Sequence, residues 1–388
     1  MKKLFLIIIM LFIILFVVNK PVKVVKKEQT NEKRAIYISY IELEKYIKKS
    51  ESESKHNIKK MIENIKNNGF NMILLQVRSF SDSIYPSKYF PWSLKVSNEE
   101  GISPGYDILD YFIKKAHKNK IEIHAWINPY RIRNNNDTSN ISKNSIAYTW
   151  LNTNNIEVSD KGIYYNPASN EVIDLIVNGV KELINNYDID GIHLDDYFYN
   201  SDTIDIDNYN EYKVNHNISL KDYRLMKVNE LIEKIHNVTK NKGILFGIAP
   251  DANIDNNYNK NYADVYKWGS SNKYVDYLMP QIYYGFYNEV KPFYKTIKEW
   301  NDIVKNSNVK LIPALSLYKS GNIDEFAKSG RNEWINNDNI LMRQIIVTRN
   351  IKKCIGFSIF RYDSMFDSNL TDKTVINEIN NIKMIIKK

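Results

Sequence analysis

Eight apolar runs, each about as long as a β-strand, recur along the chain with a longer segment between one run and the next. Apolar character is nearly continuous within each run, which is typical of strands in a parallel sheet whose two faces are both covered. Several of the longer segments carry apolar residues at helical spacing, such as NEVIDLIVNGVKELINNY at 170–187. The runs occupy residues 34–40, 71–78, 121–131, 189–199, 243–253, 275–285, 309–318 and 354–363.

Alternating strands and helices predict βα units, and eight such units predict a closed (β/α)8 barrel, the TIM barrel. A chain of 388 residues is long enough for one such barrel, which we expect to span residues 34–388. An open doubly wound sheet is the alternative, but no glycine-rich phosphate-binding loop follows the first run. We therefore expect an α/β fold, a TIM barrel with an inserted loop region after the third strand, at 132–165, which is rich in Asn and Ser.

Polar and aromatic side chains follow the apolar residues at the end of most runs. In a TIM barrel these strand ends meet at one face, which carries the active site. Carboxylates, amides, arginines and aromatic rings together suit a carbohydrate, because rings stack on the apolar face of a sugar while polar groups bind its hydroxyls. The predicted substrate-binding residues are Gln76, Arg78, Asn128, Tyr130, Arg131, His193, Tyr197, Asp251, Asn253, Gln281, Tyr283, Arg361 and Asp363, and His124, Tyr284 and Tyr362 lie at the same ends.

The fourth run contains DGIHLDDYFY, at 190–199, which places three carboxylates and a histidine in ten residues. Side chains alternate along a strand, so His193 and Asp195 are expected to share the inward face. Asp195 is then the last inward residue of the strand, and its carboxylate is expected in the barrel mouth. Asp196 follows where the strand gives way to a loop, whereas Asp190 precedes the strand and is expected to be structural.

Glycoside hydrolysis needs two carboxyl groups, one that protonates the leaving oxygen and one that acts as nucleophile or base. Asp195 is our first candidate for one of these roles, and Asp196 is the second candidate catalytic residue. The structural alternative for both is backbone capping or an ion pair with Arg131 or Arg361. Adjacent side chains normally diverge, so the partner of Asp195 stays open, with Glu42, Asp251 and Asp363 also near predicted strand ends.

Metal and cofactor signatures do not stand out in the sequence. The six histidines show no H-E-x-x-H or similar spacing, and no G-x-S-x-G sequence occurs. Cys354 is the single cysteine, which excludes an intrachain disulfide and a cysteine-rich metal site, and we expect it in the core. For His124 and His193 we favour hydrogen bonding or substrate orientation over general base catalysis. No metal and no cofactor are therefore expected.

The net charge is +9, from 54 Lys and Arg against 45 Asp and Glu. The basic residues are spread over many predicted helix faces and form no dense basic stripe, so no nucleic-acid partner is expected. Attraction to an anionic polymer is the minor alternative to simple compositional bias.

The N-terminus carries Met1-Lys2-Lys3 followed by the uncharged run LFLIIIMLFIILFVV, at 4–18. A basic start followed by an apolar stretch of this size is typical of an export signal. The run is short of the ~20 apolar residues that span a bilayer comfortably, and no cleavage motif follows it. We expect a signal peptide or an uncleaved anchor at 1–19, slightly favouring the anchor, and a charged tether at 20–33. The protein would then be extracytoplasmic, in the cell envelope, and would contact the membrane only through this segment.

Seven stretches in order resemble the glycosyl hydrolase-like family 10 proteins of bacteria. They are RAIYISYIEL, LLQVRSFSDSIYPSKYFPWS, GYDILDYFIKKAHKNKIEIHAWINPYR, NYDIDGIHLDDYFY, GIAPDANIDNNYNKNYADVYKW, VDYLMPQIYYGF and GFSIFRYDS, and together they span roughly 34–367. The resemblance implies a TIM barrel, export to the cell envelope and hydrolysis of a glycan, particularly peptidoglycan strands stripped of stem peptides. It carries Asp195 and Asp196 over as catalytic candidates and lowers the case for Asp251. Many members are lipoproteins, but this chain has no cysteine near its N-terminus.

We therefore expect an envelope glycoside hydrolase whose substrate is a polysaccharide, most consistent with peptidoglycan glycan strands. The alternative is a non-catalytic protein that binds cell-wall glycan on a TIM barrel. A metal-assisted hydrolysis such as polysaccharide deacetylation is a third hypothesis, which the histidine pattern disfavours.

Overall fold

A computed structural model describes residues 32–195 and 198–387 of the chain. They belong to one compact unit that begins at Glu32. The predicted signal or anchor at 1–19 lies outside the described residues, as does nearly all of the predicted tether. Among the helices that are described, none is long and apolar enough to cross a membrane.

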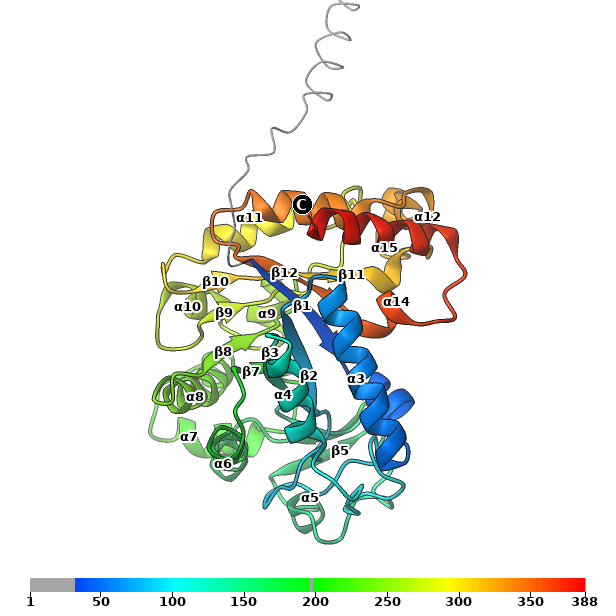
Figure 1. The fold of residues 1–388 in the computed structure, drawn as a ribbon. Helices are drawn as coiled ribbons and strands as arrows, with labels where there is room; N and C mark the ends of the chain where they lie inside the picture. Colours follow the sequence, from blue (N-terminus) through cyan, green and yellow to red (C-terminus); the bar gives the residue numbers. More distant parts are fainter. Residues whose placement is uncertain (1–31, 196–197, 388) are drawn as a thin grey trace, which may run out of the picture. The chain divides into compact units, whose positions relative to one another are not determined.

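The centre of the unit is a parallel sheet with the strand order β10-β9-β8-β7-β3-β2-β1-β12-β11 (Figure 1). Each neighbouring pair in this order is parallel. The strands are β1 (Lys33–Ile38), β2 (Met72–Arg78), β3 (Glu122–Ile127), β7 (Gly191–Leu194), β8 (Leu245–Ile248), β9 (Tyr277–Leu278), β10 (Lys310–Leu311), β11 (Ala314–Ser316) and β12 (Gly356–Phe360).

The first and last strands in this order, β10 and β11, belong to one stretch of chain, because only Ile312 and Pro313 separate them. Ile312 donates its N–H to Leu278 O at 3.0 Å, and Ser358 donates its N–H to Pro313 O at 2.9 Å. The run 310–316 therefore pairs with β9 on one side and with β12 on the other, and proline, which lacks an N–H, divides it in two. The sheet closes on itself, which confirms the predicted TIM barrel.

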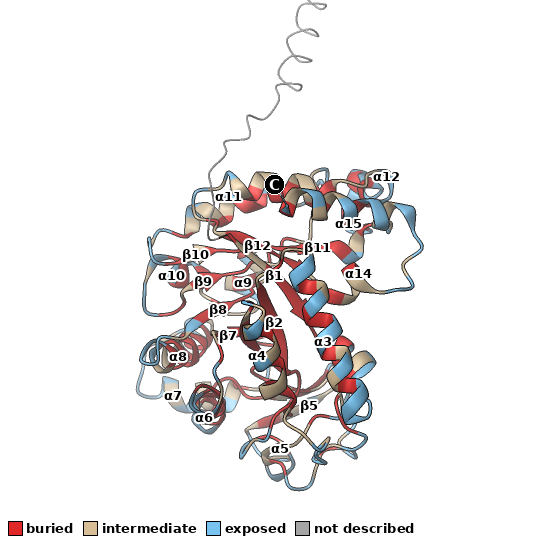
Figure 2. Cartoon of the chain, in the orientation of Figure 1, coloured by how far each residue is buried: buried red, intermediate tan, exposed pale blue. Residues whose placement is uncertain are grey.

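Helices follow the strands and cover the outside of the sheet, with their buried faces turned toward it (Figure 2). Ser and Asp residues cap most of the long helices, for example Ser169, whose side chain accepts the N–H of Val172. The long helices are α3 (Glu51–Asn67), α4 (Ile108–Lys118), α6 (Asn170–Asn186), α8 (Leu220–Lys240), α11 (Phe293–Ile303), α13 (Ile340–Arg349) and α15 (Lys373–Ile386). The shorter ones are α2 (Tyr40–Glu42), η1 (Leu43–Ile47), α7 (Ile206–Lys213), α9 (Ile254–Asn259), α10 (Val265–Ser270), η2 (Leu317–Lys319), η3 (Lys328–Gly330), α12 (Glu333–Asn336) and α14 (Tyr362–Phe366).

The inserted region after β3 contains a small sheet of its own. Its strands β4 (Arg131–Arg133), β5 (Ile156–Ser159) and β6 (Gly162–Tyr165) are antiparallel in the order β4-β6-β5, and α5 (Ile146–Thr149) lies between β4 and β5. Tyr165 donates its N–H to Tyr130 O at 2.8 Å, which ties this sheet to the end of β3. The insertion is therefore attached beside the end of β3.

Side chains of the barrel strands alternate between two cores. Leu194 belongs to the larger core between the sheet and the helices, as does Cys354. The second core fills the inside of the barrel and consists of Ala35, Tyr37, Met72, Leu74, Trp126, Ala249, Tyr277, Met279, Ile312 and Ala314.

Two glycines make room for large rings inside the barrel. A Cβ at Gly191 would lie 2.1 Å from His124 Nδ1, and one at Gly247 would lie 2.0 Å from the Tyr277 ring. These inward positions on β7 and β8 therefore require glycine, because His124 and Tyr277 occupy the space.

Candidate active site

A pocket of about 190 Å³ lies at the carboxyl ends of the barrel strands. This is the face that carries the active site in TIM barrels. The described residues that line it are Tyr37, Ser39, Tyr40, Ile41, Gln76, Trp126, Asn128, Arg131, Asp195, Ala249, Gln281, Tyr283 and Phe360. Six of them were predicted from sequence, and these are Gln76, Asn128, Arg131, Asp195, Gln281 and Tyr283.

Asp195 follows the last residue of β7, and its side chain is only 4% exposed. Its Oδ2 atom accepts a hydrogen bond from Trp126 Nε1 at 3.3 Å and another from Asn128 Nδ2. Two N–H donors on one oxygen stabilise negative charge there and fix the plane of the carboxyl group. Asp195 is thus a rigidly held carboxylate in the pocket wall.

A directional chain of hydrogen bonds leads to this carboxylate from β1. The backbone N–H of Tyr40 donates to Gln76 Oε1 at 2.8 Å, and Gln76 Nε2 donates to Asn128 Oδ1 at 2.5 Å. Asn128 Nδ2 then donates to Asp195. A backbone N–H can only donate, so it fixes the orientation of the Gln76 amide, which in turn fixes the Asn128 amide. The chain therefore presents an N–H, and not a carbonyl, to Asp195.

Aromatic rings form much of the remaining pocket wall. The Tyr37 and Trp126 rings meet edge to face with their centroids 5.2 Å apart. The Tyr283 and Phe360 rings lie 5.7 Å apart, and Tyr318 packs edge-on against both of them. Rings beside a carboxylate and three side-chain amides provide both kinds of contact that a sugar needs.

His193 lies below the pocket, inside the barrel and without solvent exposure. Its Nε2 is 3.2 Å from Tyr37 Oη and its Nδ1 is 3.0 Å from Tyr277 Oη, which also lies 2.9 Å from His124 Nδ1. Burial, assisted by the neighbouring His124, holds the pKa of His193 well below 6.5. The imidazole is therefore neutral, and it supports Tyr37 in the pocket wall instead of lining the pocket itself.

Arg78 and Tyr130 are buried beside the pocket without lining it. Arg78 Nη2 donates to Asn128 O at 3.1 Å and to Pro129 O at 2.9 Å, and its guanidinium lies 4.4 Å from the centroid of the Phe90 ring. Burial lowers the pKa of this guanidinium. Tyr130 belongs to the core outside the barrel. Arg78 therefore stabilises the backbone at Asn128 and Pro129.

Asp251 and Asn253 organise the loop after β8 and do not line the pocket. The Asp251 carboxylate accepts the N–H of Asn253 at 2.8 Å and the side-chain amide of Asn256 at 3.2 Å. Asn253 caps α9 by accepting the N–H of Asp255. Asp190 lies at the opposite end of β7, where it accepts the N–H of Ile123 at 2.7 Å.

Glu42, Arg361 and Asp363 form a cluster beside the pocket. Glu42 is fully buried and accepts hydrogen bonds from Ser39 N at 2.9 Å, from Asp363 N at 3.1 Å and from Arg361 Nη1. Asp363 pairs with Lys45 at 3.0 Å. These charged groups bind one another across the β1 and β12 ends, so Glu42 is a capping carboxylate that does not line the pocket.

Asp196 and Tyr197 lie outside the described residues. The chain that follows them is anchored by a buried ion pair, because Arg224 donates to both oxygens of Asp205 at 2.7 and 2.8 Å. Tyr199 Oη also lies 3.3 Å from Asp205 Oδ2. The later part of the loop after β7 is thus held against α8 through Asp205 and Arg224.

Sequence reasoning missed seven of the residues that line the pocket. Alternation offered a signal for Tyr37 and Trp126, since each lies two residues before a position at the end of its strand. Nothing local in the sequence distinguishes the others. They are Ser39, Tyr40, Ile41, Ala249 and Phe360. Within the described parts of the chain, no group of three or more His, Cys, Asp or Glu residues is arranged to hold a metal ion.

The model of the family called glycosyl hydrolase-like 10 matches residues 32–330. The chain is 30% identical to the glycosyl hydrolase YngK of Bacillus subtilis (strain 168) over 367 residues, which cover 88% of this chain and 70% of that protein. It is 28% identical to the glycosyl hydrolase DigH of Escherichia coli (strain K12) over 331 residues, covering 78% of this chain and 74% of that protein. The PgaB (BpsB) glycoside hydrolase domain from Bordetella bronchiseptica has a similar fold, with a TM-score of 0.52 at 10% identity over 91% of this chain and 98% of that chain. The chain therefore belongs to the glycosyl hydrolase-like 10 family.

Proposed function

We propose that this protein is an extracytoplasmic glycoside hydrolase that cleaves peptidoglycan glycan strands, with Asp195 as one of its two catalytic carboxyl groups. The observation that carries the proposal is the position of Asp195. It lies at a strand end of a TIM barrel, in a pocket lined by aromatic rings and amides, and its Oδ2 atom is held by Trp126 and Asn128.

The way in which Asp195 is held supports the proposed role. A carboxyl group that acts on a glycosidic bond must meet the sugar in a fixed orientation, because misplacement by about 1 Å can cost ~10²-fold in rate. The hydrogen bonds from Trp126 and Asn128 supply that orientation. Asp196 is our candidate for the second carboxyl group that the chemistry requires. The assignment of Asp196 rests on its sequence position directly after Asp195.

The substrate and the location rest on different support. The aromatic and amide lining of the pocket favours a carbohydrate, and the relatives are named glycosyl hydrolases. Peptidoglycan strands are the substrate implied by the family resemblance of the motifs at 34–367. The basic and apolar residues at 1–18 support export, after which the barrel would meet its polymer in the envelope.

The experiment compares three polymers with the full chain. Purified glycan strands without stem peptides, intact peptidoglycan and chitin are each incubated with the enzyme, and soluble saccharides are identified by mass spectrometry. We expect release from peptide-free strands to exceed release from the other two. Release from chitin alone would overturn the choice of polymer, and retention of the protein on all three polymers without any product would favour the non-catalytic binding protein.

A further inference from the structure

A second pocket of about 200 Å³ adjoins the active-site pocket. Tyr40 lines both pockets, so the two meet at its side chain. The second pocket lies between the loop that follows β2 and the loop that follows β4. The described residues that line it are Tyr40, Phe80, Asp82, Leu94, Lys95, Glu100, Arg133, Asn134, Asn135, Asp137 and Asn140.

Arg131 and the rings of Tyr40 and Phe80 lie close together where the two pockets meet. Arg131 lines the active-site pocket, and its guanidinium lies 5.8 Å from the centroid of the Tyr40 ring and 4.8 Å from that of Phe80. The two rings are themselves 5.4 Å apart. Aromatic side chains therefore line both pockets where they meet, and faces of aromatic rings bind the apolar faces of sugars.

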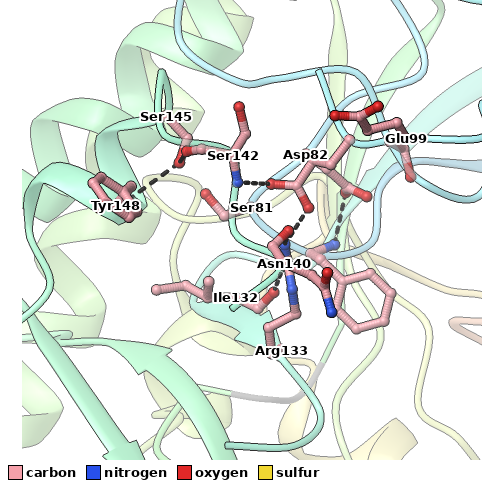
Figure 3. A network of polar contacts seen from close by, with 12 residues as sticks. Ser81, Asp82, Glu99, Ile132, Arg133, Asn140, Ser142, Ser145 and Tyr148 are labelled. Carbon is pink, nitrogen blue, oxygen red and sulfur yellow. Dashed lines mark hydrogen bonds and ion pairs between the residues drawn. The ribbon is translucent and has the colours of Figure 1, made fainter. Parts of the chain in front are cut away.

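Polar groups that bind one another hold the far side of the second pocket in place. Glu100 binds Arg133 and accepts the N–H of Ser142 at 3.0 Å, while Arg133 donates to Asn140 O at 3.3 Å. Asp82 is 3% exposed and accepts the N–H of Phe80 at 3.0 Å. Figure 3 shows Asp82, Arg133, Asn140 and Ser142 gathered in this network. One side of the pocket wall is thus held in place by hydrogen bonds and an ion pair between the two loops.

The charges in this pocket disfavour an anionic ligand. Arg133 is paired with Glu100, and Lys95 is paired with Glu44 at 2.8 Å. Each basic side chain therefore already has a carboxylate partner, which leaves a poor site for a phosphate or other anion. The exposed amides of Asn134 and Asn135 can donate to and accept from hydroxyl and acetamido groups.

We propose that the second pocket is a sugar-binding subsite, so that one glycan strand runs from Asp195 across Tyr40 to the inserted region and occupies both pockets at once. This inference rests on the proposed glycan substrate, and it adds a direction for the strand and a minimum length for tight binding. A disaccharide can fill the active-site pocket alone, whereas a longer oligomer can also reach Asn134.

Asn134 and Asn136 offer a matched pair for the test. Both are exposed asparagines of the same loop, and neither side chain makes a hydrogen bond within the described residues, but only Asn134 lines the pocket. Each is replaced by alanine and by tryptophan in the full-length Asp195→Asn protein. Binding of a peptide-free glycan disaccharide and of longer peptide-free oligomers is then measured by calorimetry.

We expect the protein with Asn134 intact to bind longer oligomers more tightly than the disaccharide. Asn134→Ala should weaken binding of long oligomers by about 3- to 10-fold, the effect of one lost hydrogen bond, and Asn134→Trp should weaken it further by filling the pocket. Disaccharide binding should not change, and both Asn136 variants should bind as the parent does.

Equal binding of long oligomers by the Asn134 and Asn136 variants would overturn the subsite, as would an affinity that does not rise with oligomer length. Both results are independent of catalysis. If Asn134 governs the binding of long oligomers while wild-type protein releases no product, the subsite stands and the proposed hydrolase activity fails.

Discussion

Asn128 donates a hydrogen bond from its side-chain amide to Oδ2 of Asp195, across neighbouring strand ends of the barrel. Asn128 is 1% exposed, and its own orientation is fixed by the hydrogen bond from Gln76. A buried amide held in this way restricts the orientation of the Asp195 carboxylate. The barrel thus orients this carboxyl group in the pocket wall.

The first prediction concerns the hydrogen bond from Asn128 to Asp195. Asn128→Leu keeps the approximate size of the side chain but removes the N–H from Asp195 and the acceptor from Gln76. We expect kcat on peptide-free strands to fall by about 10²-fold, because the carboxyl group loses its fixed orientation, with a smaller change in KM. Steady-state kinetics on variant protein with a wild-type circular dichroism spectrum check this. A kcat close to that of wild type would show that Asp195 does not need Asn128.

The second prediction separates a structural carboxylate from a catalytic one. Glu42→Gln weakens the hydrogen bonds to Ser39, Arg361 and Asp363, so we expect the free energy of unfolding to fall by roughly 1–3 kcal/mol. Turnover per folded molecule should stay close to wild type, because Glu42 does not line the pocket. Urea unfolding and kinetics on the same preparation measure both quantities. A deep loss of turnover at wild-type stability would instead identify Glu42 as the second catalytic carboxyl group.

The third prediction follows from the buried imidazole of His193. Its pKa in the folded protein lies well below 6.5, so the unfolded chain takes up a proton that the folded protein excludes. Stability should therefore fall as the pH drops below 6.5, by up to about 1.4 kcal/mol per pH unit from this group.

The measurement is urea unfolding from pH 7.5 to 5, with roughly half-unit steps, on wild type and on His193→Gln. The stability difference between the two proteins should shrink as the pH falls, because only wild type contains this histidine. A difference that is constant, or that grows toward low pH, would contradict a neutral buried His193.

Much of the fold could be predicted because its signal is local and repeated. Each strand lies in a nearly continuous apolar run, and eight such runs with helices between them favour a closed barrel. Pro313 shows one limit, since the seventh run reads as one strand but is divided in the sheet. The small sheet of the insertion shows another, because its strands at 131–133, 156–159 and 162–165 are too short to carry a pattern.

The site could be predicted in part, because parallel strands end at one face and their last inward residues converge there. Gln76, Asn128 and Asp195 were found on this basis. Arg78 lies two residues after Gln76, so simple alternation would point both side chains into the barrel. The pairing of β2 with β3 shifts register between these two residues, and alternation therefore no longer places Arg78 in the pocket.

Charged partners were harder to predict, because pairing depends on contacts between distant segments. Glu42 and Arg361 are separated by 319 positions in the sequence, and the residues around each of them do not predict the ion pair. Asp363 likewise pairs with Lys45, which lies on a different element. Strand-end position therefore predicts which residues are near the site but not which of them bind one another.

The most direct test of the account is the release of soluble saccharides from peptide-free glycan strands by wild type and by Asp195→Asn. The substitution keeps the size of the side chain and removes the ionisable carboxyl group. We predict that turnover falls by at least about 10²-fold, the lower end of the range for loss of an acid or base, while binding of the strands is retained. Equal release by the two proteins would contradict the central claim that Asp195 is a catalytic carboxyl group.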